Sequence, residues 1–120
     1  MKQLSNSELD AIESQFPVRL PGLYRKLLVE IGAGNDRDVE IYPPLEIEEM
    51  YRFHFEDPRQ LFNIYFPIGC SNRSQEIWLI RIEDDCIASI WHETHPDDYP
   101  EERWLSYEQW LAEHESILPT

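Results

Sequence analysis

The sequence predicts an α+β fold in which helices pack on a mostly antiparallel sheet, with the element order α-α-β-α-β-β-β-α. Three observations support this prediction. Amphipathic segments with capping signals lie at both ends of the chain, apolar runs rich in β-branched and aromatic residues lie between them, and short polar links join the last three runs. With 120 residues, of which 42% are hydrophobic, the chain is expected to form a single domain over residues 1–120.

The first part of the chain predicts two helices. Ser5 and Glu8 have the capping-box spacing at the start of the first helix, and Pro17 ends it. The second helix begins near Pro21, and the segment Gly32-Ala33-Gly34 supplies the positive-φ positions at its exit. The apolar residues that recur at helical spacing in the two segments are Leu9, Ile12, Phe16, Leu23, Leu27, Leu28 and Ile31.

The middle of the chain predicts a strand, a third helix and then three consecutive strands. The polar segments Gly69–Gln75 and Glu83–Asp85, which join the last three strands, are too short for a parallel crossover of about a dozen residues. These strands should therefore pair antiparallel. The expected elements are a strand at Val39–Tyr42, a helix over Leu45–Tyr51 that ends before Asp57-Pro58, and strands at Phe62–Ile68, Ile77–Ile82 and Cys86–Trp91.

A last helix is expected near the end of the sequence. Ser106 and Gln109 repeat the capping-box spacing at its start. Its expected buried face consists of Tyr107, Trp110, Leu111, Ile117 and Leu118.

The chain is strongly acidic, and the acidity is uneven. Asp and Glu number 24 against 10 Lys and Arg, which gives a net charge of -14. Residues 61–120 carry 12 acids and 3 bases, and the stretch from Glu83 to Glu102 contains 8 acids and no base. This charge disfavours binding to nucleic acid and to an anionic membrane surface, and it favours a basic protein partner. Acidity that serves only solubility is the alternative.

The segment from Thr94 to Arg103 is the most acidic loop, and aromatic residues flank it. Aromatic side chains beside charges are typical of binding hot spots, so we predict that this loop, with the turn before the last strand, contacts a partner. A solvated loop with no partner is the alternative. The predicted partner-binding residues are Asp84, Asp85, Asp97, Asp98, Tyr99, Glu101, Glu102 and Trp104.

The sequence gives little support for catalysis. It contains no G-x-S-x-G turn, and Cys70 and Cys86 lie outside any C-x-x-C motif and outside an electropositive setting. We expect both cysteines to be reduced thiols of a cytoplasmic protein, although a disulfide between them stays open. The N-terminal residues lack the apolar core of a signal peptide, and no apolar run approaches the ~20 residues of a membrane span.

The histidines near the acidic loop suggest a metal site as an alternative. His92-Glu93-Thr94-His95 departs from the H-E-x-x-H spacing of zinc proteases, which requires both histidines on one helical face. His92, His95 and Asp97 could still form a metal-dependent enzyme site in a loop. Our main expectation is a protein with no metal and no cofactor.

Four segments of the chain carry a family resemblance. Leu20–Leu28 fits the pattern L-P-x-x-Y-x-x-x-L, and Phe66–Gly69 reads F-P-I-G. The third segment, Pro44-Leu45, lies between them at the start of the predicted third helix. The fourth segment is Ser106–Leu111, at the start of the last predicted helix. In this order and spacing the sequence resembles the SUKH superfamily, which contains bacterial immunity proteins and the yeast cell wall assembly regulator. The segment after Gly69 departs from the Gly- and Asp-rich turn of that family.

The resemblance implies an α+β fold with no catalytic activity. It further implies that many bacterial members bind and neutralise a toxin domain, often a nuclease, and it transfers no individual site residue. Since a nuclease surface is basic, the resemblance agrees with the acidic charge and suggests a non-enzymatic immunity protein with a cognate toxin as its partner. A regulatory interaction module that binds a host protein is the alternative.

Overall fold

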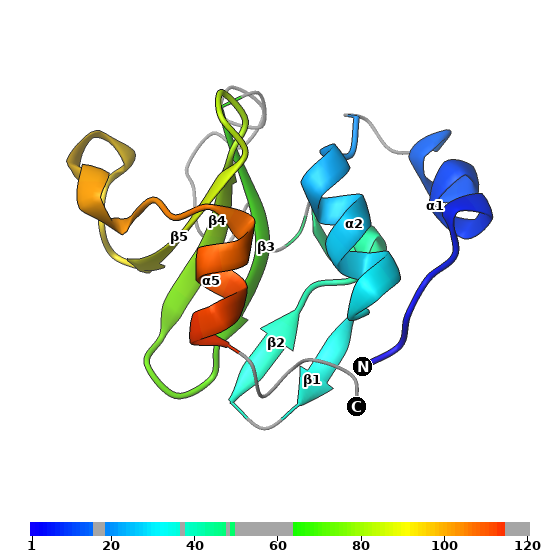
Figure 1. Ribbon diagram of the computed structural model, residues 1–120, viewed down its shortest axis with the longest axis horizontal. Helices are drawn as coiled ribbons and strands as arrows, with labels where there is room; N and C mark the ends of the chain where they lie inside the picture. The colour runs from blue at the N-terminus through cyan, green and yellow to red at the C-terminus, as the bar shows by residue number, and fades with distance from the viewer. Residues whose placement is uncertain (16–18, 37, 48, 50–63, 115–120) are drawn as a thin grey trace.

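The computed structural model describes residues 1–15, 19–36, 38–47, 49 and 64–114 of the chain. Its centre is a five-stranded antiparallel sheet in the order β1-β2-β3-β4-β5, which confirms the predicted α+β class (Figure 1). Strand β5 lies at one edge of this sheet. The strands are β1 (Gly34–Asp36), β2 (Val39–Ile41), β3 (Tyr65–Ser71), β4 (Glu76–Arg81) and β5 (Cys86–Trp91).

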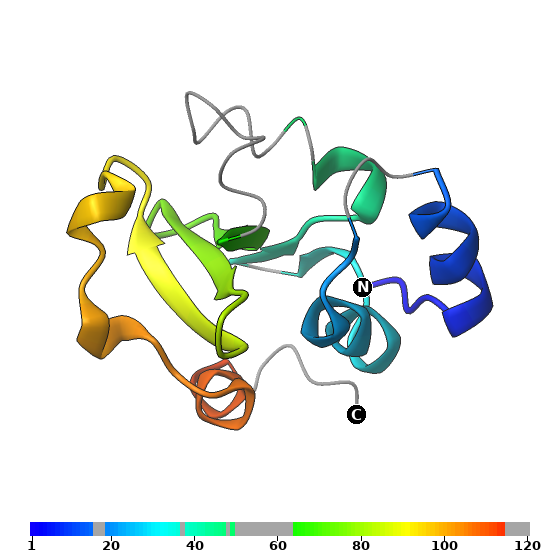
Figure 2. The same ribbon diagram turned by 90° about the horizontal axis from the view of Figure 1, so that it is seen from above.

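Three helices are described, namely α1 (Asn6–Glu13), α2 (Gly22–Glu30) and α5 (Tyr107–Glu113). Both predicted capping boxes are present, with Ser5 and Glu8 at α1 and Ser106 and Gln109 at α5. Helices α2 and α5 lie on one face of the sheet, and the short 3-10 helix η1 (Pro44–Glu46) lies on the other (Figures 1 and 2). Within the described ranges, no helix has the length and apolar character needed to cross a membrane.

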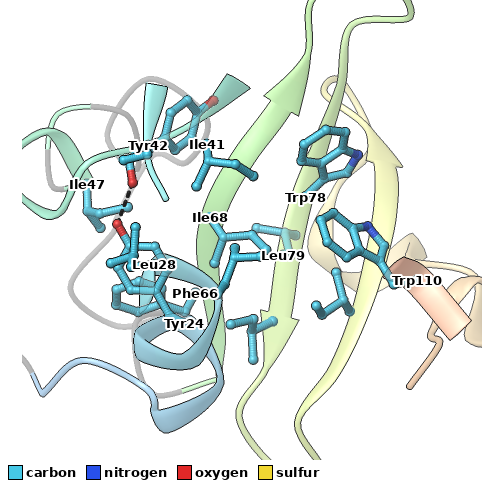
Figure 3. Close-up of a cluster of buried hydrophobic side chains, with 14 of the residues drawn as sticks. Tyr24, Leu28, Ile41, Tyr42, Ile47, Phe66, Ile68, Trp78, Leu79 and Trp110 are labelled. Atoms are coloured by element: carbon cyan, nitrogen blue, oxygen red, sulfur yellow. Dashed lines mark hydrogen bonds between the residues drawn. The ribbon is translucent and has the colours of Figure 1, made fainter. Parts of the chain in front are cut away.

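The hydrophobic core fills the space between the sheet and these helices (Figure 3). Trp78 of β4 meets Trp110 of α5 edge to face, with ring centroids 5.3 Å apart. Tyr24 of α2 contacts Phe66 of β3, and its hydroxyl donates a hydrogen bond to the carbonyl oxygen of Tyr42. Each aromatic pair of this kind contributes about 0.5–1.5 kcal/mol of stability beyond the burial of its apolar area. The two pairs therefore stabilise the packing of α2 and α5 on the central strands.

The predicted turn at Gly69–Gln75 is wrong at its start, because β3 continues to Ser71. Gly69 pairs with Ile41 of β2, and a β-carbon at this position would lie 2.1 Å from the carbonyl oxygen of Glu40. Glycine is therefore required by the close approach of a neighbouring strand. The turn itself is shorter than predicted, and Gln75 at its end has a positive φ of 59°.

Strand β1 is absent from the sequence-based prediction, which treats Gly32-Ala33-Gly34 only as a helix exit. The exit is confirmed, since Gly32 and Gly34 have φ values of 109° and 125°. The chain then continues directly into β1, which pairs with β2. Ala33 also forms a bridge with Lys2, and a β-carbon on Gly32 would lie 2.5 Å from the Lys2 carbonyl oxygen.

Several predicted features lie outside the described residues. Of the predicted third helix the structure describes η1 and the buried Ile47, while residues 50–63 lie outside. That range contains Asp57-Pro58 and Phe62, the predicted start of the next strand. The remaining features outside are Phe16, Pro17, Ile117 and Leu118.

Candidate functional site

The predicted partner-binding residues come from two segments near the edge strand β5. Asp84 and Asp85 lie in the turn that joins β4 to β5. The other segment follows β5 and contains two short 3-10 helices, η2 (Pro96–Asp98) and η3 (Glu101–Arg103). This segment curves outside the β5 edge and returns to it, where Leu105 and Ile87 exchange two backbone hydrogen bonds of 2.8 Å (Figures 1 and 2).

Arg81 joins the two acidic segments. Its guanidinium donates two hydrogen bonds to Asp84, of 3.0 Å and 2.6 Å, and one of 2.9 Å to Glu101 of η3. The hydrogen bonds from Arg81 hold the pKa of Asp84 down at about 2. Because Arg81 binds both carboxylates, the turn and η3 are held at a fixed separation, and part of their negative charge is balanced.

An aromatic cluster lies beneath this ion-pair network. The ring of Trp104 stacks on Tyr65 of β3 with centroids 5.6 Å apart, and Tyr99 meets Tyr65 edge to face at 5.0 Å. The Arg81 guanidinium lies 4.7 Å from the centre of the Trp104 ring. Tyr65 and Arg81 are register partners, so their side chains leave the same face of the sheet. Burial raises the pKa of Tyr99.

The predicted aromatic contacts Tyr99 and Trp104 are thus partly buried, and they support the loop. The acidic residues around them divide into two groups. Asp84 and Glu101 are ion-paired with Arg81. The other four are exposed and are not bound by Arg81, and we refer to them below as the acidic surface; they are Asp85, Asp97, Asp98 and Glu102.

Most carboxylates of the acidic surface have no ion-pair partner among the described residues. Within the described part of the chain, Asp85, Asp98 and Glu102 take part in no ion pair, and Asp97 is paired only with His95, at 3.5 Å. Asp85 has a positive φ of 57°, which the tight turn between β4 and β5 imposes and which Asp tolerates. The structure therefore presents exposed carboxylates on a segment that is bound to the sheet.

The histidines of the alternative metal site do not converge. The ring Nδ1 of His92 lies 3.1 Å from the carbonyl oxygen of Gln75, in the turn between β3 and β4. The ring Nδ1 of His95 accepts a hydrogen bond of 3.2 Å from the backbone N–H of Asp97. Among the residues that the structure describes, no three His, Cys, Asp or Glu side chains gather as metal ligands would. The geometry thus gives no support to the metal-dependent enzyme.

Cys70 and Cys86 are free thiols. Cys70 pairs with Ile77 near one end of β4, and Cys86 pairs with Arg81 at the other end. Four residues of extended strand separate those partners by about 13 Å, well beyond the ~7 Å that a disulfide can bridge between Cα atoms. The possibility of a Cys70–Cys86 disulfide, which the sequence left open, does not fit this register.

Sequence reasoning missed Arg81 and Tyr65, the two residues on which the loop rests. A signal for Arg81 was present, because it is the one Lys or Arg between Arg73 and Arg103 in an otherwise acidic stretch. Tyr65 gave no such signal, since its role depends on the register between β3 and β4. Trp91 lies at the end of β5, as the predicted strand has it, and the residue is 46% exposed.

Comparison with known proteins identifies the family. The SUKH_6 family model, described as SMI1-KNR4 cell-wall, matches residues 6–111. This range includes α1, the whole described sheet and the acidic loop, and it confirms the resemblance seen in the sequence. No curated protein matches the chain. The chain therefore belongs to the SMI1-KNR4 cell-wall family of the SUKH superfamily.

Proposed function

We propose that this protein is a non-enzymatic immunity protein that binds and neutralises a cognate bacterial toxin domain in the cytoplasm. Membership of the SUKH superfamily, which includes immunity proteins, supports the class of function. The observation that carries the proposal is the acidic surface, which stands on a segment bound to the sheet through Arg81 and the aromatic cluster.

The charge of this surface fits a basic partner. A fixed group of carboxylates raises the rate of encounter with a basic protein, because the field acts before the two surfaces touch. Charge pairs that are desolvated on contact can each contribute about 1.5–7 kcal/mol of coupling. A nuclease domain has the required basic surface, since it binds phosphates, and a protein that covers this surface blocks the enzyme without breaking any bond.

The order of the loop adds to the affinity. A partner that binds a disordered acidic segment must supply the free energy that orders it, whereas a segment already held by Arg81 and Trp104 avoids much of that cost. Arg81, Tyr99 and Trp104 therefore have a supporting role, and the exposed acids make the contacts.

Growth rescue tests the proposal. Where a neighbouring gene encodes a large secreted protein, its C-terminal domain is the candidate toxin; this domain is expressed with and without this protein, and growth is measured. We expect the wild-type chain to restore growth and the variant Asp98→Lys/Glu102→Lys to fail. The matched control is Glu46→Lys/Glu113→Lys, which changes the net charge equally at exposed sites outside the acidic surface.

Circular dichroism first establishes that both double variants fold. Rescue by the control but not by the acidic-surface variant supports the proposal. Absence of rescue by the wild-type chain overturns the immunity function, and equal rescue by both variants removes the acidic surface from the interface.

A further inference from the structure

Trp91 differs from the other tryptophans in its exposure. Trp78 and Trp110 are 2% and 0% exposed in the core, and Trp104 is stacked on Tyr65. Trp91, at the end of the edge strand β5, is 46% exposed, and His92 contacts its ring at a centroid distance of 4.6 Å. Trp91 therefore presents a large aromatic surface beside the acidic loop, and it belongs neither to the acidic surface nor to the aromatic cluster around Tyr65.

A pocket of about 110 Å³ lies against Trp91 at the β5 edge. Ser89 and Trp91 of β5 line it, together with Thr94, Pro100 and Arg103 from the segment that follows and Glu76 from β4. Glu76 and Trp91 are register partners in adjacent strands, which places their β-carbons about 5 Å apart. The pocket thus combines an aromatic surface with a carboxylate.

Ser89, which lines the pocket, has a backbone carbonyl that points outward from the sheet edge. The N–H and C=O groups of Ile87 point away from β4, because both bind Leu105. Since the direction alternates along an antiparallel edge strand, those of Ser89 and Trp91 point the same way. The Trp91 carbonyl accepts from the N–H of Thr94 at 2.9 Å, whereas the outward carbonyl of Ser89 has no partner in the part of the chain that the structure describes.

The carboxylate of Glu76 also retains capacity to accept hydrogen bonds. Its Oε1 accepts from the Ser74 hydroxyl at 3.1 Å, while its Oε2 lies 3.8 Å from the Arg103 guanidinium, which is longer than a hydrogen bond. The Arg103 side chain is 59% exposed, so a cation from outside can take its place beside Glu76.

We propose that this pocket binds an arginine side chain of the protein partner. Arginine fits because its planar guanidinium can stack on the Trp91 indole. Its several N–H groups can donate to the Glu76 carboxylate and the Ser89 carbonyl together. Its positive charge is attracted by the surrounding acids. The identity of the partner as a basic protein rests on the proposed function. The pocket itself is defined by Trp91, Glu76 and Ser89, none of which belongs to the acidic surface.

The test uses two short peptides and requires no toxin. Acetyl-Gly-Gly-Arg-Gly-Gly-amide and the same peptide with citrulline, the uncharged isostere of arginine, are titrated into the isotopically labelled protein at low salt. Resonance shifts of the Trp91 indole, identified with Trp91→Phe, and of the Ser89 and Trp91 amides are followed. We expect saturable shifts with the arginine peptide and a Kd at least threefold weaker for citrulline.

Variants sharpen the test. Glu76→Gln should weaken arginine-peptide binding about threefold or more, and Arg103→Ala should strengthen it, because the competing cation is removed. Leu45→Ala, which changes an exposed apolar side chain outside the pocket, is the control and should have no effect. Equal shifts with the two peptides, an unchanged Kd in Glu76→Gln, or weaker binding in Arg103→Ala would overturn the inference. Growth rescue is scored separately, so failure of one test is distinct from failure of the other.

Discussion

Replacement of Arg81 by methionine tests the ion-pair network that holds the acidic loop. The substitution keeps a long apolar side chain but removes three hydrogen bonds and the contact with the Trp104 ring. The side chain of Arg81 is 14% exposed, that of Asp84 is 39% exposed and that of Glu101 is 80% exposed. The Asp84 bonds are therefore the stronger part of the network.

These exposures set the expected magnitude. Two charge-assisted hydrogen bonds to a partly exposed carboxylate contribute about 1–2 kcal/mol, the exposed Glu101 pair adds about 0.2–0.5 kcal/mol, and the cation–π contact adds about 0.5–1 kcal/mol. Arg81→Met should thus lower the free energy of unfolding by about 1.7–3.5 kcal/mol. For a chain of this size that corresponds to a fall in Tm of about 7–14 °C.

Urea unfolding and hydrogen exchange measure the effect. Residues 96–104 should exchange faster in Arg81→Met than in the wild-type protein, because the segment loses its connection to β4. The matched control is Arg73→Met, since Arg73 is 83% exposed and lies 3.9 Å from Asp38, and it should change stability by less than about 0.5 kcal/mol. If both arginine variants lose the same stability, the assigned role of Arg81 is wrong.

Three further predictions concern the same fold. Asp84→Asn should destabilise the protein at pH 7, and the difference in free energy of unfolding from wild type should shrink as the pH falls from about 4 towards 2. The pKa of Asp84 is lower in the folded state than its unfolded value of about 3.9, so the stability that the carboxylate contributes is present above that value and is lost on protonation. Urea unfolding at several pH values measures this difference. Gly69→Ala should cost about 1–3 kcal/mol or more, because the new β-carbon meets the Glu40 carbonyl oxygen, and a wild-type Tm would contradict the close approach. Ser106→Ala should cost about 1 kcal/mol through loss of the α5 capping box, and Ser106→Asp should restore most of that loss in thermal unfolding.

The sequence predicted the elements whose signals are local. The capping boxes at Ser5 and Ser106 mark the starts of α1 and α5, and the strand Cys86–Trp91 has the predicted bounds. Strand β1 could not be found in this way, because its residues Gly34, Asn35 and Asp36 are types that are depleted in strands and typical of turns. The role of Gly69 was also hidden, since it depends on a strand that is distant in sequence.

The candidate site divides in the same manner. Exposure of Asp98 and Glu102 followed from their position in a polar, acidic loop. The ion pairs of Arg81 with Asp84 and Glu101 could not be predicted from the sequence. They depend on how the β4–β5 turn faces a segment about twenty residues further along the chain. The sheet register and the return of the chain to Ile87 create these contacts. The order of charges along the sequence gives no information on either.

The rate of association with the toxin domain, measured by stopped flow from low to high salt, tests the central claim that the acidic surface acts by charge. The wild-type rate constant should fall steeply with ionic strength, the Asp98→Lys/Glu102→Lys variant should be at least tenfold slower at low salt, and the two should converge at high salt. The Glu46→Lys/Glu113→Lys control should keep a rate much closer to that of the wild-type protein. Identical rates and salt dependence for wild type and the acidic-surface variant would contradict the account.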